Sequence, residues 1–195
     1  MVPFVGLTGG LGAGKSTALA ALAELGAAVI SSDAVVHELY RGEELREALL
    51  SRLGPEVLTD GVVDRAAVAE RVFARPEDRV WLEGVVWPLV GARVAGWLED
   101  VRAQTPPPRA AVAEVPLLFE AGLQDIYDAT IAVVSEEGLR KHRAEQRGHA
   151  LVDERAARQL SQQEKAARAT FVVHNDGTER DLKAELSVIL DKLGG

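Results

Sequence analysis

The fold is decided by the stretch Gly9-Gly10-Leu11-Gly12-Ala13-Gly14-Lys15-Ser16-Thr17, which matches the pattern G-x-x-x-x-G-K-[ST]. This pattern forms a phosphate-binding loop (P-loop) where it follows a strand and opens a helix. The short apolar run at residues 2–7 suits a buried parallel strand, although Pro3 restricts its start. After the motif, Leu19, Leu22 and Leu25 recur at helical spacing until Gly26. Both neighbours therefore have the character that a P-loop requires.

The loop specifies a chemistry as well as a fold. Its glycines let successive backbone N–H groups point at phosphate oxygens, and the positive end of the following helix reinforces them. Lys15 is expected to reach the β- and γ-phosphates of ATP, and the Ser16 hydroxyl to hold Mg²⁺. The predicted nucleotide-binding residues of the loop are Gly10, Leu11, Gly12, Ala13, Gly14, Lys15, Ser16 and Thr17. The alternative is a glycine-rich turn with a lysine at a helix start.

Composition restricts the possible classes of protein. The 195 residues, 47% of them hydrophobic, suffice for one sizeable core, so we expect a single domain over residues 1–195. The chain has no cysteine, which excludes disulfides and thiol catalysis and suits a reducing cytoplasm. The net charge of -8 argues against a nucleic-acid surface, and no early apolar stretch has membrane length. We therefore expect a soluble, cytoplasmic protein that binds neither nucleic acid nor membrane, while its oligomeric state stays open.

A basic cluster at residues 139–168 stands out in this acidic chain. It holds eight Lys or Arg residues against four acids, a local charge of +4. If residues 136–147 form a helix, Arg140, Arg143 and Arg147 share a face, where like charges repel unless an anion lies between them. One interpretation is a clamp for phosphate, because phosphoryl transfer needs cations on its developing charge. The other is a solvated helix face balanced by acids such as Glu136 and Glu145.

Strands and helices are predicted to alternate along the chain. Besides the first strand, apolar runs at 27–30, 110–115, 129–134 and 170–173 are typical of strands. Helices are expected at 32–40, 43–53, 65–73, 77–97 and 179–193, with breaks at 54–55 and 60–61 and with Pro88 kinking or interrupting the fourth helix. About five strands with helical crossovers indicate an α/β fold, a parallel sheet with helices on both faces. The helical excursion at 34–105 is too long for a crossover, so we expect a lobe for the phosphoryl acceptor.

Ligands of such a sheet bind beyond the carboxyl ends of its strands, which singles out three polar residues. Asp33 follows the second strand and is a candidate base for an attacking hydroxyl, although Ser31-Ser32-Asp33 is also a typical helix cap. Glu114 ends the next strand, and a carboxylate in so apolar a run favours a Mg²⁺ ligand. Asn175, followed by Asp176 and Gly177, either contacts the purine of ATP or forms an ordinary turn.

Several motifs together resemble the dephospho-CoA kinase family, in the right order and over nearly the whole chain. They are the segment 6–17, Asp33-Ala34, Val72-Phe73, Pro88-Leu89-Val90, Val115-Pro116-Leu117-Leu118-Phe119-Glu120, Arg143 with Arg147, Arg158 with Gln162, and Asn175 with Gly177. The P-loop is shared by many enzymes, whereas residues 116–120 combined with Asp33 are far more specific. Ser31, Trp87 and Thr170 depart from the family pattern, in which Asp, His and Asp are usual.

The resemblance implies a P-loop kinase fold and the last step of coenzyme A synthesis, in which ATP phosphorylates the 3'-hydroxyl of dephospho-CoA. It implies a helical lid at 139–168 and an acceptor lobe at 34–105. The implied catalytic residues are Asp33 as base, Lys15, Arg143 and Arg147; Asn175 and Gly177 are placed near the adenine of ATP, and Asp33, Arg65, Pro116 and Leu117 on the acceptor side. A kinase for another small metabolite, or a nucleotide-dependent switch, is the alternative, although the chain has no Asn-Lys-x-Asp guanine motif.

Overall fold

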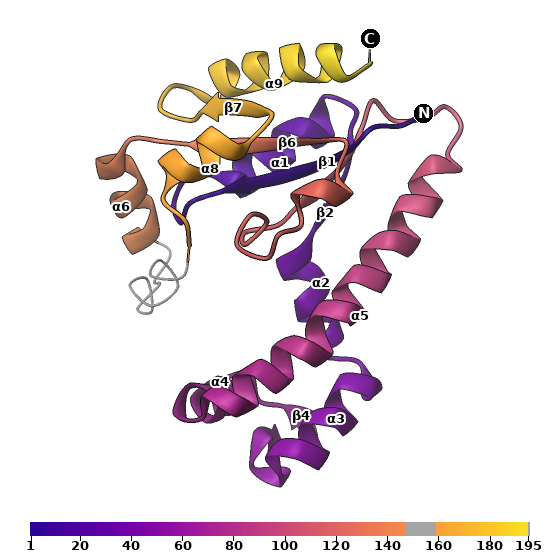
Figure 1. The fold of residues 1–195 in the computed structure, drawn as a ribbon, viewed down its shortest axis with the longest axis vertical. Coiled ribbons are helices and arrows are strands. Elements are labelled where there is room, and N and C mark those ends of the chain that lie inside the picture. The colour runs from indigo at the N-terminus through magenta and orange to yellow at the C-terminus, as the bar shows by residue number, and fades with distance from the viewer. Residues whose placement is uncertain (147–158, 195) are drawn as a thin grey trace. The chain divides into compact units, whose positions relative to one another are not determined.

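The computed structural model describes residues 1–146 and 159–194 (Figure 1). The chain forms two compact units, one made of Met1–Ser31 with Leu98–Gly195 and the other of Ser32–Trp97. The second unit overlaps the helical lobe expected at 34–105, whose role in holding the acceptor stays a prediction. No helix within the described ranges is both long and apolar enough to cross a membrane.

The first unit is built on a five-stranded parallel sheet in the order β2-β5-β1-β6-β7. Its strands are β1 (Phe4–Gly9), β2 (Ala28–Ser31), β5 (Ala111–Glu114), β6 (Ala129–Val134) and β7 (Phe171–His174). The register pairs Val5 with Val112 on one side and with Ala129 on the other. The α/β fold predicted from the apolar runs is therefore confirmed.

The central position of β1 decides where a ligand can bind. After β1, the chain forms β2 and β5 on one side of that strand and then crosses over to form β6 and β7 on the other side. In an open parallel sheet, ligands bind at such a reversal of strand order, outside the carboxyl ends of the strands. The segment that leaves β1 at this edge is the glycine-rich motif at 9–17.

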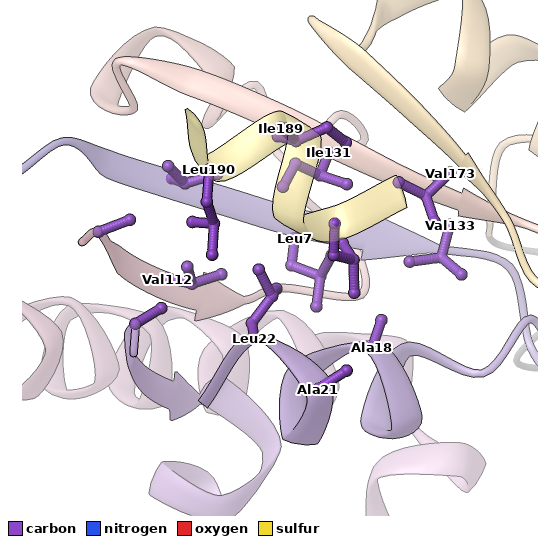
Figure 2. Close-up of a cluster of buried hydrophobic side chains, with 14 of the residues drawn as sticks. Leu7, Ala18, Ala21, Leu22, Val112, Ile131, Val133, Val173, Ile189 and Leu190 are labelled. Atoms are coloured by element: carbon purple, nitrogen blue, oxygen red, sulfur yellow. The ribbon is translucent and has the colours of Figure 1, made fainter. Parts of the chain in front are cut away.

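One face of the sheet is covered by α1 (Lys15–Glu24) and α9 (Glu179–Gly194), which pack against each other. Figure 2 shows apolar side chains of four strands meeting those of both helices. The buried residues of this core include Leu7, Val112, Ile131, Val133 and Val173 from the sheet, Ala18, Ala21 and Leu22 from α1, and Leu186, Ile189 and Leu190 from α9. Side chains alternate along a strand, so Leu7 faces this core and its neighbours Gly6 and Thr8 face the opposite side.

The opposite face is covered by the segment after β5 and by α8 (Gln162–Arg168). Tyr127 lies against Phe4 with ring centroids 4.5 Å apart, next to the short helix η2 (Gln124–Ile126). Gly6 has no space for a side chain, because a Cβ there would lie 2.5 Å from Cδ1 of Leu118. The helix α6 (Glu137–Gln146) follows β6, and the described chain resumes shortly before α8.

The second unit is helical and has a core of its own. Its elements are α2 (Ser32–Leu39), α3 (Glu43–Leu53), η1 (Pro55–Val57), β3 (Leu58–Thr59), β4 (Val62–Val63), α4 (Arg65–Ala74) and α5 (Pro76–Arg102), whose last residues belong to the first unit. The break expected at residues 60–61 is the turn of a small antiparallel hairpin, in which Asp60 and Gly61 both have positive φ. α5 continues through Pro88 without interruption, because Val86 and Val90 pack into the core on either side of it.

Candidate active site

The motif at 9–17 forms a loop whose shape requires glycine. Gly12 and Gly14 have φ values of 74° and 92°, in the region that side-chain-bearing residues rarely adopt. Gly14 is the N-cap of α1 and has no side chain. It therefore cannot accept a hydrogen bond from the first-turn N–H groups of the helix. Lys15 Nζ donates to the carbonyl oxygens of Gly9 and Gly10 at 3.1 and 3.3 Å, which places its ammonium over the loop. The loop has the backbone arrangement that binds phosphate.

Three other segments approach the loop so closely that each leaves no space for a Cβ atom. A Cβ on Gly9 would lie 2.5 Å from the carbonyl oxygen of Val133 in β6. A Cβ on Gly12 would meet the carbonyl of Arg140 in α6, and one on Gly14 would meet the amide nitrogen of Asn175, just after β7. The loop is therefore held by elements that are far away in the sequence.

Two arginines of the basic cluster lie at the loop. Arg140 Nε donates to the carbonyl oxygen of Leu11 at 3.1 Å, and its guanidinium lies beside Gly10. Arg143 Nη1 donates to Ser135 Oγ at 3.2 Å and to the carbonyl oxygen of Asn175 at 3.1 Å. Both approach from α6, where residues three apart share a face. Arg140 was not among the predicted catalytic residues, although the same spacing indicated it; Arg147 and Arg158 lie outside the described residues.

Asn175 holds the P-loop in place through a buried hydrogen bond. Its side chain is buried, and Nδ2 donates to the carbonyl oxygen of Ala13 at 2.9 Å. Its own carbonyl accepts from Arg143 and from Ser135 Oγ, so a single residue joins the loop, α6 and the end of β6.

The turn after Asn175 is fixed by Asp176, whose Oδ1 accepts from the backbone N–H of Glu136 at 2.6 Å. Gly177 lies in this turn, close to Asp181.

Two side chains with oxygen atoms that could hold a divalent cation, Ser16 and Glu114, lie at the same edge of the sheet. Ser16 is exposed in the first turn of α1. Glu114 is 6% exposed and is in register with Leu7, so its side chain shares the sheet face that α1 covers. Residues 1–146 and 159–194 contain no group of three or more potential metal-binding side chains. Mg²⁺ is compatible with so few protein ligands, because it keeps several waters and binds substrate phosphates.

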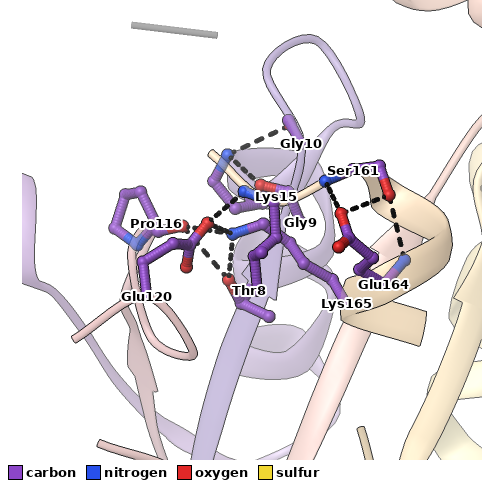
Figure 3. Close-up of polar contacts among 10 residues, drawn as sticks. Thr8, Gly9, Gly10, Lys15, Pro116, Glu120, Ser161, Glu164 and Lys165 are labelled. Atoms are coloured by element: carbon purple, nitrogen blue, oxygen red, sulfur yellow. Dashed lines mark hydrogen bonds and ion pairs between the residues drawn. The ribbon is translucent and has the colours of Figure 1, made fainter. Parts of the chain in front are cut away.

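A buried cation lies at the carboxyl end of β1 that sequence reasoning missed. Lys165, on α8, has no exposed surface, and its Nζ donates to the carbonyl oxygen of Pro116 at 2.7 Å and pairs with Glu120 at 2.8 Å (Figure 3). Burial lowers the pKa of the Lys165 ammonium, while the hydrogen bond and charge of Glu120 oppose that shift. Pro116 is thus fixed through its carbonyl, and Leu117 is half-buried in the turn that follows. The charge count of the basic cluster gave no sign that this lysine is internal.

In the second unit, Asp33 is exposed in the first turn of α2. The helix begins at Ser32, and within the described part of the chain the Asp33 carboxylate makes no hydrogen bond or ion pair. The capping role that the sequence also allowed is therefore not what this carboxylate does here. His37 is one helical turn further on and lies on the same face of α2.

Arg65 contacts that face of α2. It bonds Nδ1 of His37 at 2.5 Å, and its guanidinium lies 5.4 Å from the centroid of the Tyr40 ring. Its place at the start of α4 is fixed by the preceding residue, Asp64, which caps the helix by accepting from the N–H groups of Ala66 and Ala67 at 2.8 and 3.2 Å. Those backbone bonds hold the pKa of Asp64 below its usual value. Asp33 and His37 thus lie one turn apart on the same face of α2, and Arg65 contacts that face through His37.

Comparison with known proteins identifies the family. The dephospho-CoA kinase family model matches residues 3–181. The chain belongs to the dephospho-CoA kinase family. It is 38% identical over 183 residues to a dephospho-CoA kinase of Mycolicibacterium paratuberculosis, covering 91% of this chain but 44% of that protein. It is also 38% identical over 196 residues to a dephospho-CoA kinase of Anaeromyxobacter dehalogenans, with 98% of this chain and 92% of the relative covered.

The fold is also that of a solved dephospho-CoA kinase, the one from Campylobacter jejuni, which superposes with a TM-score of 0.73 at 23% identity and covers 100% of this chain and 98% of that one. The crystal structure of TT1252 from Thermus thermophilus superposes with a TM-score of 0.81 at 35% identity, covering 100% of this chain and 99% of that one. As a member of the dephospho-CoA kinase family, the chain is a P-loop kinase. Both the family resemblance and the P-loop kinase fold predicted from the sequence are confirmed.

The crowding at Gly14 leads to a test of the kinase's P-loop. An alanine there carries a left-handed backbone cost of roughly 1–2 kcal/mol and must displace the Asn175 amide, so the loop relaxes from its phosphate-binding shape. Gly14→Ala is expected to weaken ATP binding by about tenfold or more in a calorimetric titration. Gly122→Ala is the matched control, because Gly122 has φ 66° but open space around its Cβ position. Equal ATP affinities of the two variants would contradict the role given to this contact.

Proposed function

We propose that this kinase transfers the γ-phosphoryl group of ATP to the 3'-hydroxyl of dephospho-CoA, giving coenzyme A. The observation that carries the proposal is the match of the dephospho-CoA kinase family over residues 3–181. The P-loop supports ATP as the phosphoryl donor, and the exposed carboxylate of Asp33 supports a hydroxyl as the acceptor. The absence of cysteine suits work in a reducing cytoplasm.

The donor side of the reaction is assigned to the first unit. Backbone N–H groups of residues 10–17 would cradle the phosphates, and the Lys15 ammonium would move from the loop carbonyls to the β- and γ-phosphates. Arg143, together with Arg147, which lies outside the described residues, would stabilise the charge that develops on the transferring group. Arg140 already lies beside Gly10 and adds a third cation near the loop. Asn175 supports the site by holding Ala13, and Gly177 shapes the turn next to it.

Mg²⁺ would be held by the Ser16 hydroxyl, with Glu114 as a ligand or as a partner of a bound water. When bound, the cation neutralises negative charge on the β- and γ-phosphate oxygens. The protein contributes the positions of these two oxygens, one on the first turn of α1 and one at the carboxyl end of β5.

The acceptor side is assigned to Asp33 and Arg65, together with Pro116 and Leu117. Asp33 would accept the proton of the attacking 3'-hydroxyl, a role that its solvent exposure and lack of other partners within the described residues leave open. Arg65 bonds His37 and so lies at the same face of α2 as Asp33. An arginine in this place suits the anionic groups of dephospho-CoA. Positioning and charge stabilisation account for such a reaction with little covalent work by the protein.

A product assay tests the reaction itself. The protein is incubated with Mg-ATP and dephospho-CoA, and with nucleosides in parallel, and 3'-phosphorylated product is measured by chromatography. Coenzyme A is the expected product. Phosphorylated nucleoside without coenzyme A would indicate a different metabolite kinase, and slow release of ADP and phosphate with no phosphorylated acceptor would indicate a nucleotide switch.

Asp33→Asn tests the assignment of the base. The amide keeps the shape of the side chain but cannot accept the proton, so kcat with dephospho-CoA is expected to fall by about 10²–10⁴-fold while ATP affinity is retained. Glu38→Gln removes an exposed carboxylate from the same helix and should leave turnover unchanged. Near-normal turnover of Asp33→Asn would remove Asp33 as the base.

Arg65→Ala tests the assignment of the acceptor side. Loss of a charged hydrogen bond to the acceptor should raise the KM for dephospho-CoA by about tenfold or more, with the KM for ATP unchanged. Arg46→Ala is the control, since Arg46 lies in the same unit and bonds only the exposed turn carbonyl of Gly61 among the contacts described. An increase in the KM for ATP instead would assign Arg65 to the nucleotide.

A further inference from the structure

Lys165 is a completely buried cation that the mechanism above does not use. Its Nζ contacts Glu120 Oε1 at 2.8 Å, the carbonyl oxygen of Pro116 at 2.7 Å and Thr8 Oγ1 at 3.4 Å. Figure 3 shows this group directly beside the P-loop, next to Lys15 and its bonds to Gly9 and Gly10. Lys15 faces the loop, whereas Lys165 reaches the end of β1 from α8.

A buried ion pair is a weak source of folding stability. Removing two charges from water costs several kcal/mol per ion, and replacement of such a pair by neutral groups of similar volume is often neutral or stabilising. The lowered pKa of Lys165 reflects the same desolvation. The arrangement is therefore better explained by what the ammonium holds in place than by a contribution to stability.

The ammonium joins three segments at the carboxyl edge of the sheet. Thr8 directly precedes the P-loop, and its hydroxyl also donates to Pro116 at 3.3 Å. Pro116 begins the segment after β5 that carries the family motif. Glu120 Oε1 accepts from the backbone N–H of Leu160 at 2.8 Å as well as from Lys165, so the same carboxylate anchors the chain that leads into α8. The first residue of α8, Gln162, is also fixed: its side chain accepts from the backbone N–H of Ser135 and donates to the carbonyl oxygen of the same residue.

We propose that Lys165 is a positioning residue for phosphoryl transfer, which with Glu120 locks the segment 116–120 against the strand that carries the P-loop. It acts through Pro116 and Thr8 and touches neither substrate. The inference rests on the proposed function, because Pro116 and Leu117 are the acceptor-side residues of that function. A fixed separation of donor loop and acceptor segment is what in-line transfer requires, and a displacement of about 1 Å can cost about 10²-fold in rate.

The test uses three variants of the full chain. Lys165→Met keeps an unbranched side chain but leaves the Glu120 carboxylate buried without its cation, so its melting temperature should fall. Glu120→Gln combined with Lys165→Met removes both charges and keeps an acceptor for the Leu160 N–H, so the melting temperature should recover. Lys183→Met is the matched control, because it breaks the exposed pair of Lys183 with Glu24 on α9 and α1.

The double variant separates positioning from stability. We expect it to melt near the wild type and to bind ATP normally, while kcat with dephospho-CoA falls by about 10²-fold. Lys183→Met should match the wild type in melting temperature, ATP affinity and kcat. A double variant with normal kcat would show that the pair is only structural, and one that stays as unstable as Lys165→Met would show that the pair is needed for folding; either result overturns the inference. Absence of coenzyme A formation by the wild type would instead overturn the proposed function.

Discussion

The structure of the site depends on the close approach of other backbone segments to the phosphate loop. Gly9, Gly12 and Gly14 each face an atom of another element, and none of these contacts leaves space for a Cβ. Those atoms belong to β6, to α6 and to the residue that follows β7. The loop can therefore have its shape only when the sheet is assembled in the order that places β6 beside β1 and β7 beside β6. Local sequence supplies the glycines, but the sheet supplies the surfaces that they fit.

Much of the fold follows from the sequence because its signals are local. The five apolar runs, the glycine motif and the helical spacing after it all act within a few residues, and the strands form where they were expected. The hairpin of β3 and β4 was missed, since two-residue strands have too few side chains to show an alternating pattern. The continuity of α5 through Pro88 was missed for a different reason: core packing on both sides of the proline outweighs its local cost.

The motif of the candidate site could be predicted from the sequence, but the distant residues that hold the motif in place could not. Asn175 reaches Ala13 across 162 positions of sequence, and Lys165 reaches Thr8 across 157. Charge counting treats every lysine and arginine as a surface group, so it assigned Lys165 to a solvated or phosphate-binding cluster. Contacts of that range are set by how β1, β5 and α8 come together, which a single sequence does not display.

The burial of Lys165 also gives it a distinctive chemistry. Its amine has no exposed surface, whereas Lys183 is partly exposed and Lys192 lies on the surface of α9. An acylating reagent will therefore modify α9 in the folded protein and will reach Lys165 only when α8 parts locally from the sheet. The rate at which the Lys165 amine is acylated therefore reports how often this region opens.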